Sequence, residues 1–131
     1  MIKERLADAE LDIMRVLWHS DKALKASEIT KSLTKKRAWT KQTVHVLLSR
    51  LEGKGFVKVD RSGYFHLFSA AVEESEYLAG ESSRIVKKTG SSVHSLLASL
   101  IEADELSDED IISISDMLNA KRREIEENNN D

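Results

Sequence analysis

The chain has 131 residues, of which 40% are hydrophobic and 33% charged, with a formal net charge of -3 and neither Cys nor Pro. This length suits one domain or two small ones, and the apolar content suffices for a core. The absence of Cys excludes disulfides, thiolate metal sites and thiol catalysis. No apolar run approaches the roughly 18 residues of a membrane span, and the N-terminus lacks the apolar stretch of a signal peptide. We therefore expect a cytoplasmic protein without membrane attachment.

Charge divides the chain into two unlike parts. Residues 1–70 carry 14 Lys and Arg against 8 Asp and Glu, a net +6, whereas residues 71–131 carry 6 against 15, a net -9. Eight basic residues and one acidic residue lie between Lys31 and Lys58. A basic half in an acidic protein is typical of a polyanion-binding part beside a part with another role. A lysine-rich solvated surface explains the same composition, so charge alone leaves both interpretations open.

The first part of the chain predicts two helices before residue 36. Asp8 is placed to cap the first helix, and apolar residues then recur at helical spacing. These residues are Leu11, Met14, Leu17 and Trp18. The second helix covers about 26–35, with Ile29 and Leu33 one turn apart on its inner side.

A third helix has the most regular apolar period in the chain. Thr40 serves as its N-cap, and it ends at Gly53-Lys54-Gly55, where a glycine can take the left-handed conformation. Its apolar stripe is Val44, Leu47, Leu48 and Leu51. The opposite side carries Lys41, Gln42, His45, Val46, Ser49 and Arg50.

Two strand-like runs follow the third helix. They cover 56–61 and 64–68, and the two residues between them, Ser62-Gly63, predict a tight hairpin. Three helices and a hairpin form a winged helix-turn-helix, in which the third helix enters the major groove. The hairpin is then a wing, whose tip brings Arg61 to the phosphate backbone. The fold class is mainly α with a small β-hairpin wing, and residues 1–70 form the predicted DNA-binding domain.

Residues 71–131 predict three helices with apolar stripes. One covers about 73–88, a second begins at Val93, and the last opens on a capping-box-like pair, Ser107 and Asp110, before a tail expected to fray. Because three such helices form a marginal core alone, we expect a homodimer through this helical domain. The predicted dimerisation residues are Tyr77, Leu78, Val93, Leu96, Leu97, Leu100, Ile101, Ile111, Ile114 and Leu118.

The sequence gives little support to catalysis or to a bound cofactor. It has no glycine-rich phosphate loop, no His-Glu-x-x-His and no Gly-x-Ser-x-Gly. Its four His are scattered, and its acidic pairs fall at predicted helix starts, where they complement the helix dipole. We expect no catalytic residues, no metal site and no cofactor.

Several separated blocks of the sequence resemble the penicillinase-repressor family, of the BlaI/MecI/CopY type. The block 39–51, WTKQTVHVLLSRL, is similar to the recognition helix of that family. Further similar blocks fall at 6–10, 16–18, 95–100 and 106–111, so the resemblance spans roughly 5–125. It implies a winged-helix homodimer that represses transcription by occupying double-stranded operators with TACA/TGTA-like inverted half-sites. It also implies release by a signal that acts on the dimer.

The chain departs from the family pattern at informative positions. Many members open the recognition helix with Ser-Pro-Lys-Thr or Ser-Lys-Ser-Thr, where this chain has Thr40-Lys41-Gln42-Thr43, and Val46 replaces a family Thr. Gln suits adenine and Val the thymine methyl, which points to a variant operator. The Asn-Phe bond that is cut in β-lactam-responsive members corresponds to Ser99-Leu100, and the Cys-x-Cys pairs of copper-responsive members are missing. The inducing signal is therefore left unassigned.

Two alternatives remain beside the repressor. One is a winged-helix protein-interaction module whose basic face binds an acidic protein, because fold does not fix function. The other is an effector- or metal-sensing variant with a ligand at the dimer interface. The DNA-binding candidates are Lys41, Gln42, Thr43, His45, Val46, Ser49, Arg50 and Arg61.

Overall fold

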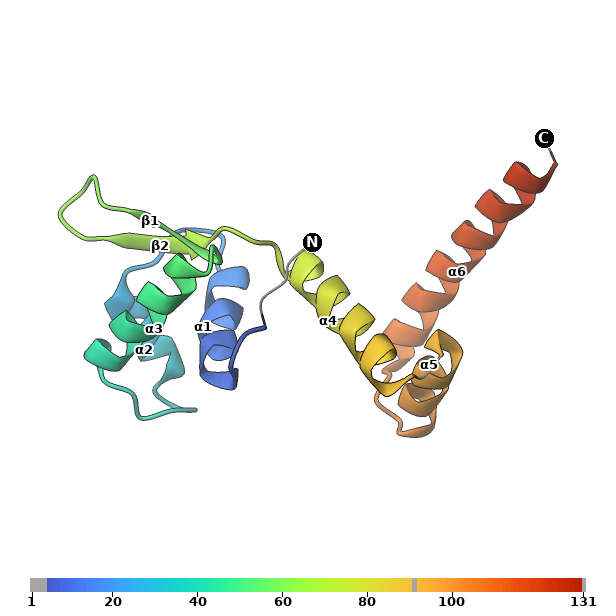
Figure 1. Ribbon diagram of the computed structural model, residues 1–131, viewed down its shortest axis with the longest axis horizontal. Helices are drawn as coiled ribbons and strands as arrows, with labels where there is room; N and C mark the ends of the chain where they lie inside the picture. Colours follow the sequence, from blue (N-terminus) through green and yellow to red (C-terminus); the bar gives the residue numbers. More distant parts are fainter. Residues whose placement is uncertain (1–4, 91, 131) are drawn as a thin grey trace. The chain divides into compact units, whose positions relative to one another are not determined.

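The computed structural model describes residues 5–90 and 92–130, which form six helices and a two-stranded antiparallel sheet (Figure 1). The elements are α1 (Asp8–Trp18), α2 (Ala26–Leu33), α3 (Lys41–Gly53), β1 (Val57–Asp60), β2 (Leu67–Ala70), α4 (Glu74–Thr89), α5 (Val93–Glu102) and α6 (Asp108–Asn129). The chain divides into two compact units, the first ending at Arg84 and the second beginning at Ile85.

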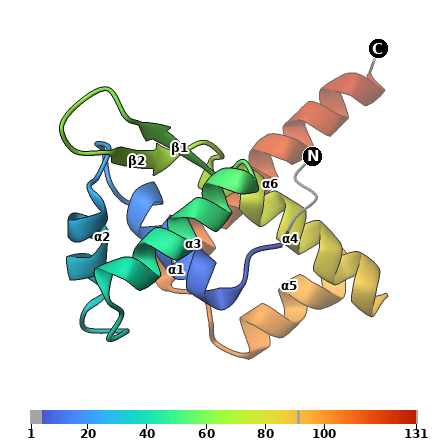
Figure 2. The ribbon, with the colours of Figure 1, turned by 60° about the vertical axis from the view of Figure 1, so that its left-hand side comes forward.

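The core of the first unit lies between α1, α2, α3 and the hairpin (Figure 2). The apolar stripe predicted for α3 is confirmed, because Val44, Leu47, Leu48 and Leu51 are all buried. On α1, Met14 and Leu17 are buried as predicted, but Ile13 is fully buried as well. The residues on the opposite side of α3 are exposed, so one side of this helix packs in the core and the other faces solvent.

Side chains at the helix ends explain where the helices of this unit begin and stop. The Thr40 hydroxyl accepts a hydrogen bond from the Thr43 N–H at 3.2 Å, which confirms Thr40 as the N-cap of α3. Gly55 takes a φ of 85°, the left-handed conformation expected after this helix. The prediction for α1 is wrong, because Ala7 is its N-cap. The Glu10 carboxylate accepts the Ala7 N–H at 3.0 Å, which makes a cap by Asp8 unnecessary.

The hairpin differs from the tight two-residue turn that the sequence predicts. Asp60 pairs with Leu67, so the connection is a six-residue loop, 61–66, here called the wing loop. The Asp60 carboxylate accepts hydrogen bonds from the Ser62 N–H at 2.9 Å and the Ser62 hydroxyl at 2.6 Å, which turns the chain out of β1. Phe68 also forms an antiparallel bridge with Leu24, which precedes α2. This bridge helps to place β2 at Leu67–Ala70, whereas the sequence predicts a strand over 64–68.

Tyr77 belongs to the core of the first unit, which corrects its prediction as a dimerisation residue. Its ring is 5% exposed and lies 5.7 Å from the Trp18 ring and 5.9 Å from the Phe56 ring, measured between centroids. The first half of α4 is thereby part of the first unit, whereas the predicted boundary lies at residue 70. The sequence pattern of α4 shows an apolar stripe but not which partner covers it.

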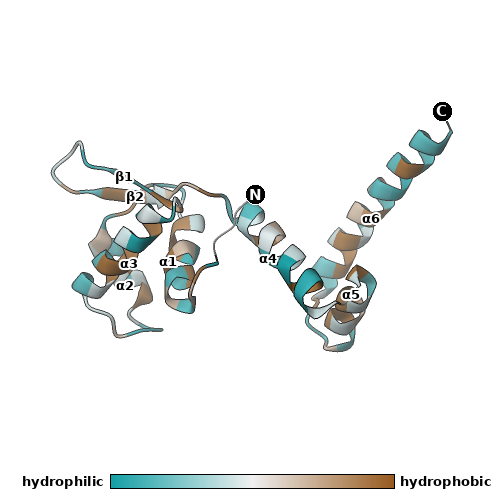
Figure 3. Cartoon of the chain, viewed as in Figure 1, coloured by the Kyte–Doolittle hydropathy of each residue, from teal (hydrophilic) through white to brown (hydrophobic). Residues whose placement is uncertain are grey.

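The second unit has no buried residue in α5 or α6. Large apolar residues are exposed on both helices. In the hydropathy colouring of Figure 3, hydrophobic stretches of the α5 and α6 ribbons alternate with hydrophilic ones. The capping box of α6 is confirmed, with the Asp110 N–H donating to the Ser107 hydroxyl at 3.1 Å. The prediction of a frayed tail is wrong, because α6 continues to Asn129. No Gly or Pro interrupts it, and each added residue gains a backbone hydrogen bond.

Candidate nucleic-acid interface

The outer side of α3 presents seven of the eight DNA-binding candidates. All seven are exposed, and Val46 is 49% exposed although it is apolar. The buried stripe on the other side ties the helix to the core, so this surface is rigidly held. The seven are Lys41, Gln42, Thr43, His45, Val46, Ser49 and Arg50.

A shallow groove of about 230 Å³ lies beside α3, between the start of α2 and the wing loop. Its lining comes from the start of α2, from α3, from the wing loop and from β2. The residues are Lys25, Ala26, Ser27, Lys41, His45, Tyr64, Phe65, His66 and Phe68. The Lys25 ammonium lies 4.3 Å from the centre of the Phe65 ring, which holds the wing loop toward α2. Tyr64, with 93% of its surface exposed, packs edge-on against Phe65 at 4.8 Å between centroids. The groove thus joins cations and exposed aromatic rings, a combination suited to nucleic acid.

Four of these groove residues, Lys25, Tyr64, Phe65 and His66, are not among the DNA-binding candidates that the sequence predicts. Lys25 lies outside the basic run that begins at Lys31, and the other three residues lie in the run 64–68, whose pattern predicts a strand. The sequence does contain a signal for this groove: Lys25 directly precedes the second helix, and Tyr64 and Phe65 are aromatic residues at the predicted hairpin tip. The partnership becomes visible only when Leu24 pairs with Phe68 and brings the two segments together.

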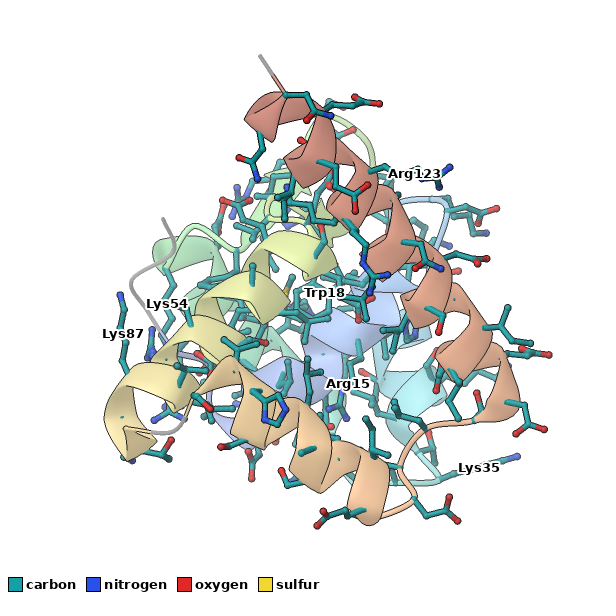
Figure 4. All side chains as sticks on the ribbon, turned by 90° about the vertical axis from the view of Figure 1, so that its right-hand side faces the viewer. Arg15, Trp18, Lys35, Lys54, Lys87 and Arg123 are labelled. Carbon is teal, nitrogen blue, oxygen red and sulfur yellow. The ribbon has the colours of Figure 1, made fainter. Side chains whose placement is uncertain are left out.

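Some side chains of the basic run between Lys31 and Lys58 form ion pairs with buried acidic residues of α1. Asp12 is 5% exposed, and its carboxylate accepts hydrogen bonds from Arg37 Nε at 2.6 Å and from Lys36 Nζ at 3.0 Å. Burial opposes ionisation of Asp12, but the hydrogen bonds and charges of these two cations outweigh it and lower the pKa of Asp12. Lys36 and Arg37 therefore belong to an ion cluster around the buried Asp12, whereas Lys35 extends away from the chain (Figure 4).

A second buried acid binds Lys54, which is labelled in Figure 4. Glu10 is 3% exposed, and its Oε1 lies 2.8 Å from Lys54 Nζ. Burial opposes ionisation here too, but the Lys54 contact and the Ala7 N–H lower the pKa of Glu10. Glu10 Oε2 is buried without a hydrogen-bond partner among the described residues.

Arg61 is held by α3 instead of standing free at the wing tip. Its guanidinium makes two hydrogen bonds to the Glu52 carboxylate, at 2.8 and 3.0 Å. The Arg61 hydrogen bond lowers the pKa of Glu52, and the same contact raises the pKa of Arg61. A phosphate contact by Arg61 must compete with this pair, so its predicted role is weaker than the sequence suggests.

The ion clusters predict that acid weakens the first unit. Because the pKa values of Glu10 and Asp12 are lowered on folding, their stabilisation is complete above the unfolded values, roughly 4. It is lost as the pH falls through the lowered folded values, since the unfolded state binds protons first. Thermal unfolding between pH 6 and 3 should show a steep fall in Tm that is shallower in Asp12→Asn. The exposed Asp21→Asn should follow the wild type, and parallel curves for all three proteins would contradict this origin.

Nine of the ten predicted dimerisation residues lie outside the core described above. Val93, Ile101 and Leu118, for example, are 61%, 60% and 58% exposed. Ser99 and Leu100, the pair that the resemblance predicts as the counterpart of a cleaved bond, are consecutive exposed residues inside α5. A bond within a helix is a poor protease substrate until that helix opens.

No group of three His, Cys, Asp or Glu gathers as a metal site within residues 5–90 and 92–130. Over the same residues, no helix combines the length and apolar character needed to cross a bilayer.

Comparison with known proteins identifies the family. The chain is 28% identical to the penicillinase repressor of Bacillus licheniformis over 116 residues, which cover 87% of this chain and 89% of that protein. It is 26% identical to the methicillin resistance regulatory protein MecI of Mammaliicoccus sciuri over 117 residues, covering 88% and 94%. The solution structure of the DNA-binding domain of the repressor BlaI matches with 30% identity and a TM-score of 0.49, covering 56% of this chain and 88% of that one. The penicillinase repressor model matches residues 6–120, so the chain belongs to the penicillinase repressor family, whose members are transcriptional repressors and not enzymes.

Proposed function

We propose that this chain is a homodimeric repressor that occupies a palindromic, TACA/TGTA-like operator with one α3 helix in each half-site. The bound dimer obstructs transcription sterically, and a signal that acts on the dimer releases it. The observation that carries this proposal is the exposed polar side of α3, held over a fully buried stripe. That arrangement is what a recognition helix needs in order to present side chains to base edges.

The distribution of side chains along α3 supports a division of roles. Gln42 and Val46 lie one turn apart near the middle of the exposed side, where they can reach an adenine and a thymine methyl. Lys41 lies at the start of the helix and lines the groove toward the wing loop, a position suited to phosphate. The Thr43 hydroxyl lies 3.1 Å from the Thr40 hydroxyl, so it belongs to the capping arrangement at the same helix end.

The second unit supports the dimer. Neither α5 nor α6 has a buried residue, and large apolar side chains line both helices. Exposed apolar surface of this extent is typical of an interaction surface. A second copy covers it symmetrically and supplies the second recognition helix that a palindrome requires. The alignments with the penicillinase repressor and MecI cover 89% and 94% of those proteins, which supports a common role for the region that includes this unit.

Gln42→Ala should weaken operator binding by about 1–3 kcal/mol and relax discrimination at one base position. The loss arises because a bidentate contact to a base edge disappears while the helix stays in place. Fluorescence anisotropy on duplexes substituted at each half-site position measures both effects. An equal loss on every duplex, scrambled ones included, would refute base reading by Gln42.

Lys41→Ala should weaken binding to all duplexes alike. Each phosphate contact releases about one counterion, so the slope of log K against log salt should fall by about one. A titration between 50 and 200 mM salt, a range in which phosphate binding changes steeply, gives the slope. Lys35→Ala is a matched control in the same basic run; a slope change for Lys35 but not Lys41 would place the phosphate contact elsewhere.

A further inference from the structure

Two acids of α1 reach opposite ends of α3. We call Glu10 and Asp12 the α1 carboxylate pair; they are 3% and 5% exposed. Residues two apart on a helix point to different sides. Asp12 therefore contacts the segment that enters α3, and Glu10 contacts the residue that ends it.

At the entrance of α3, contacts form a continuous chain from α1. The Asp12 carboxylate holds Arg37 at 2.6 Å and Lys36 at 3.0 Å. The Arg37 guanidinium lies over the Trp39 ring, 4.9 Å from its centre. Trp39 packs against the core and directly precedes Thr40, the N-cap of α3. The position of the first turn of α3 thus depends on Asp12 through two intermediate side chains.

At the other end, Lys54 is the C-cap residue of α3, and its ammonium lies 2.8 Å from Glu10. The same Glu10 oxygen accepts the Ala7 N–H at 3.0 Å, which fixes the carboxylate at the start of α1. Both ends of α3 are therefore tied by ion pairs to one neighbouring helix, α1.

We propose that the α1 carboxylate pair positions α3 for base reading, and that Lys36, Arg37 and Lys54 are scaffold cations, not phosphate ligands. This inference rests on the proposed operator binding. Its physical basis is the cost of separating a buried carboxylate from its closest cation. If these cations moved to phosphate, Glu10 would keep the Ala7 N–H at 3.0 Å and Asp12 the more distant Arg15 at 4.0 Å. The basic run between Lys31 and Lys58 therefore offers DNA fewer cations than the eight that the sequence shows.

Positioning affects specific and non-specific binding differently. A bidentate base contact requires correct distance and angle, so a small rotation of α3 removes it. Attraction between Lys or Arg and the phosphate backbone is long-ranged and tolerates such a rotation. A positioning residue should therefore change the ratio of operator to scrambled-duplex affinity while leaving the salt slope unchanged.

The test measures anisotropy of the full-length chain on a palindromic and a scrambled duplex over a salt series. Asp12→Asn should lose about tenfold in operator affinity, the size of effect typical of coupling through packed contacts, with its salt slope unchanged. Asp21→Asn makes the same charge change at an exposed position and should keep the wild-type ratio. Circular dichroism confirms that each variant is folded at the assay temperature.

Arg37→Gln provides a second variant that keeps Asp12 paired with Lys36. It should leave the salt slope unchanged, and the double variant with Asp12→Asn should bind the operator no more weakly than Asp12→Asn alone. A slope lowered by about one on both duplexes would make Arg37 a phosphate ligand and overturn the inference. A folded Asp12→Asn with the wild-type ratio overturns it too. A wild-type chain that does not discriminate between the duplexes overturns the proposed function and this inference together.

Discussion

Tyr77→Ala should destabilise the first unit by about 3–5 kcal/mol, as large aromatic-to-alanine changes in cores do. The ring fills the space between Trp18 and Phe56, and its hydroxyl accepts the Leu6 N–H at 3.4 Å. Removing it leaves a cavity within the first unit, where the first half of α4 packs against Trp18 and Phe56. Because total stability is commonly 5–15 kcal/mol, this is a large fraction. Both Trp residues lie in the first unit, so urea unfolding followed by Trp fluorescence reports on this unit specifically.

Two neighbouring variants separate core packing from dimerisation. Tyr77→Phe keeps the ring and should cost at most about 1 kcal/mol. Leu78→Ala changes a side chain that is 54% exposed and should leave the unfolding midpoint of the first unit nearly unchanged. If Tyr77→Ala altered the oligomeric state but not the Trp-detected stability, Tyr77 would be an interface residue, as its sequence pattern suggested.

Leu97→Asp combined with Ile101→Asp should convert the proposed dimer to a monomer at micromolar concentration. The two side chains lie one turn apart on α5, and they are 40% and 60% exposed. Placing two carboxylates in an apolar interface is costly, since they lose hydration without gaining partners. Operator affinity should then fall by about 10²–10⁴-fold, because the two half-sites are no longer bound by linked helices.

The control makes the same charge change on the other side of a neighbouring helix. Ser113 and Ala120 are exposed on the face of α6 opposite Ile114 and Leu118. Ser113→Asp combined with Ala120→Asp should leave the molar mass and operator affinity close to the wild type. Sedimentation equilibrium gives the mass. A monomeric wild type, or a Leu97 and Ile101 double variant that remains dimeric, would contradict the proposed interface.

Features that depend on a few neighbouring residues could be predicted from the sequence. The Thr40 cap, the Gly55 conformation and the Ser107–Asp110 capping box each depend on residues within one turn. The buried stripe of α3 follows from helical spacing alone. These local rules are enough to predict a recognition helix and the surface that it presents.

Features that depend on a residue far away in the sequence could not be predicted from local patterns. The charge of Lys54 is visible in the sequence, but its pairing with Glu10, 44 residues earlier, is not. The wing register depends on Leu24, and the burial of Tyr77 depends on Trp18. Each case is a long-range contact that competes with a reasonable local interpretation. Counting basic residues therefore overestimated the cations available to DNA.

The most direct test of the central claim is anisotropy of the purified chain on a duplex with TACA and TGTA inverted half-sites. A scrambled duplex of equal composition is the control, and both are titrated over a salt series. The account predicts binding at least about 10³-fold tighter to the palindrome, with two protomers per duplex. Equal and steeply salt-dependent binding to both duplexes would show backbone affinity alone and contradict operator recognition of this kind.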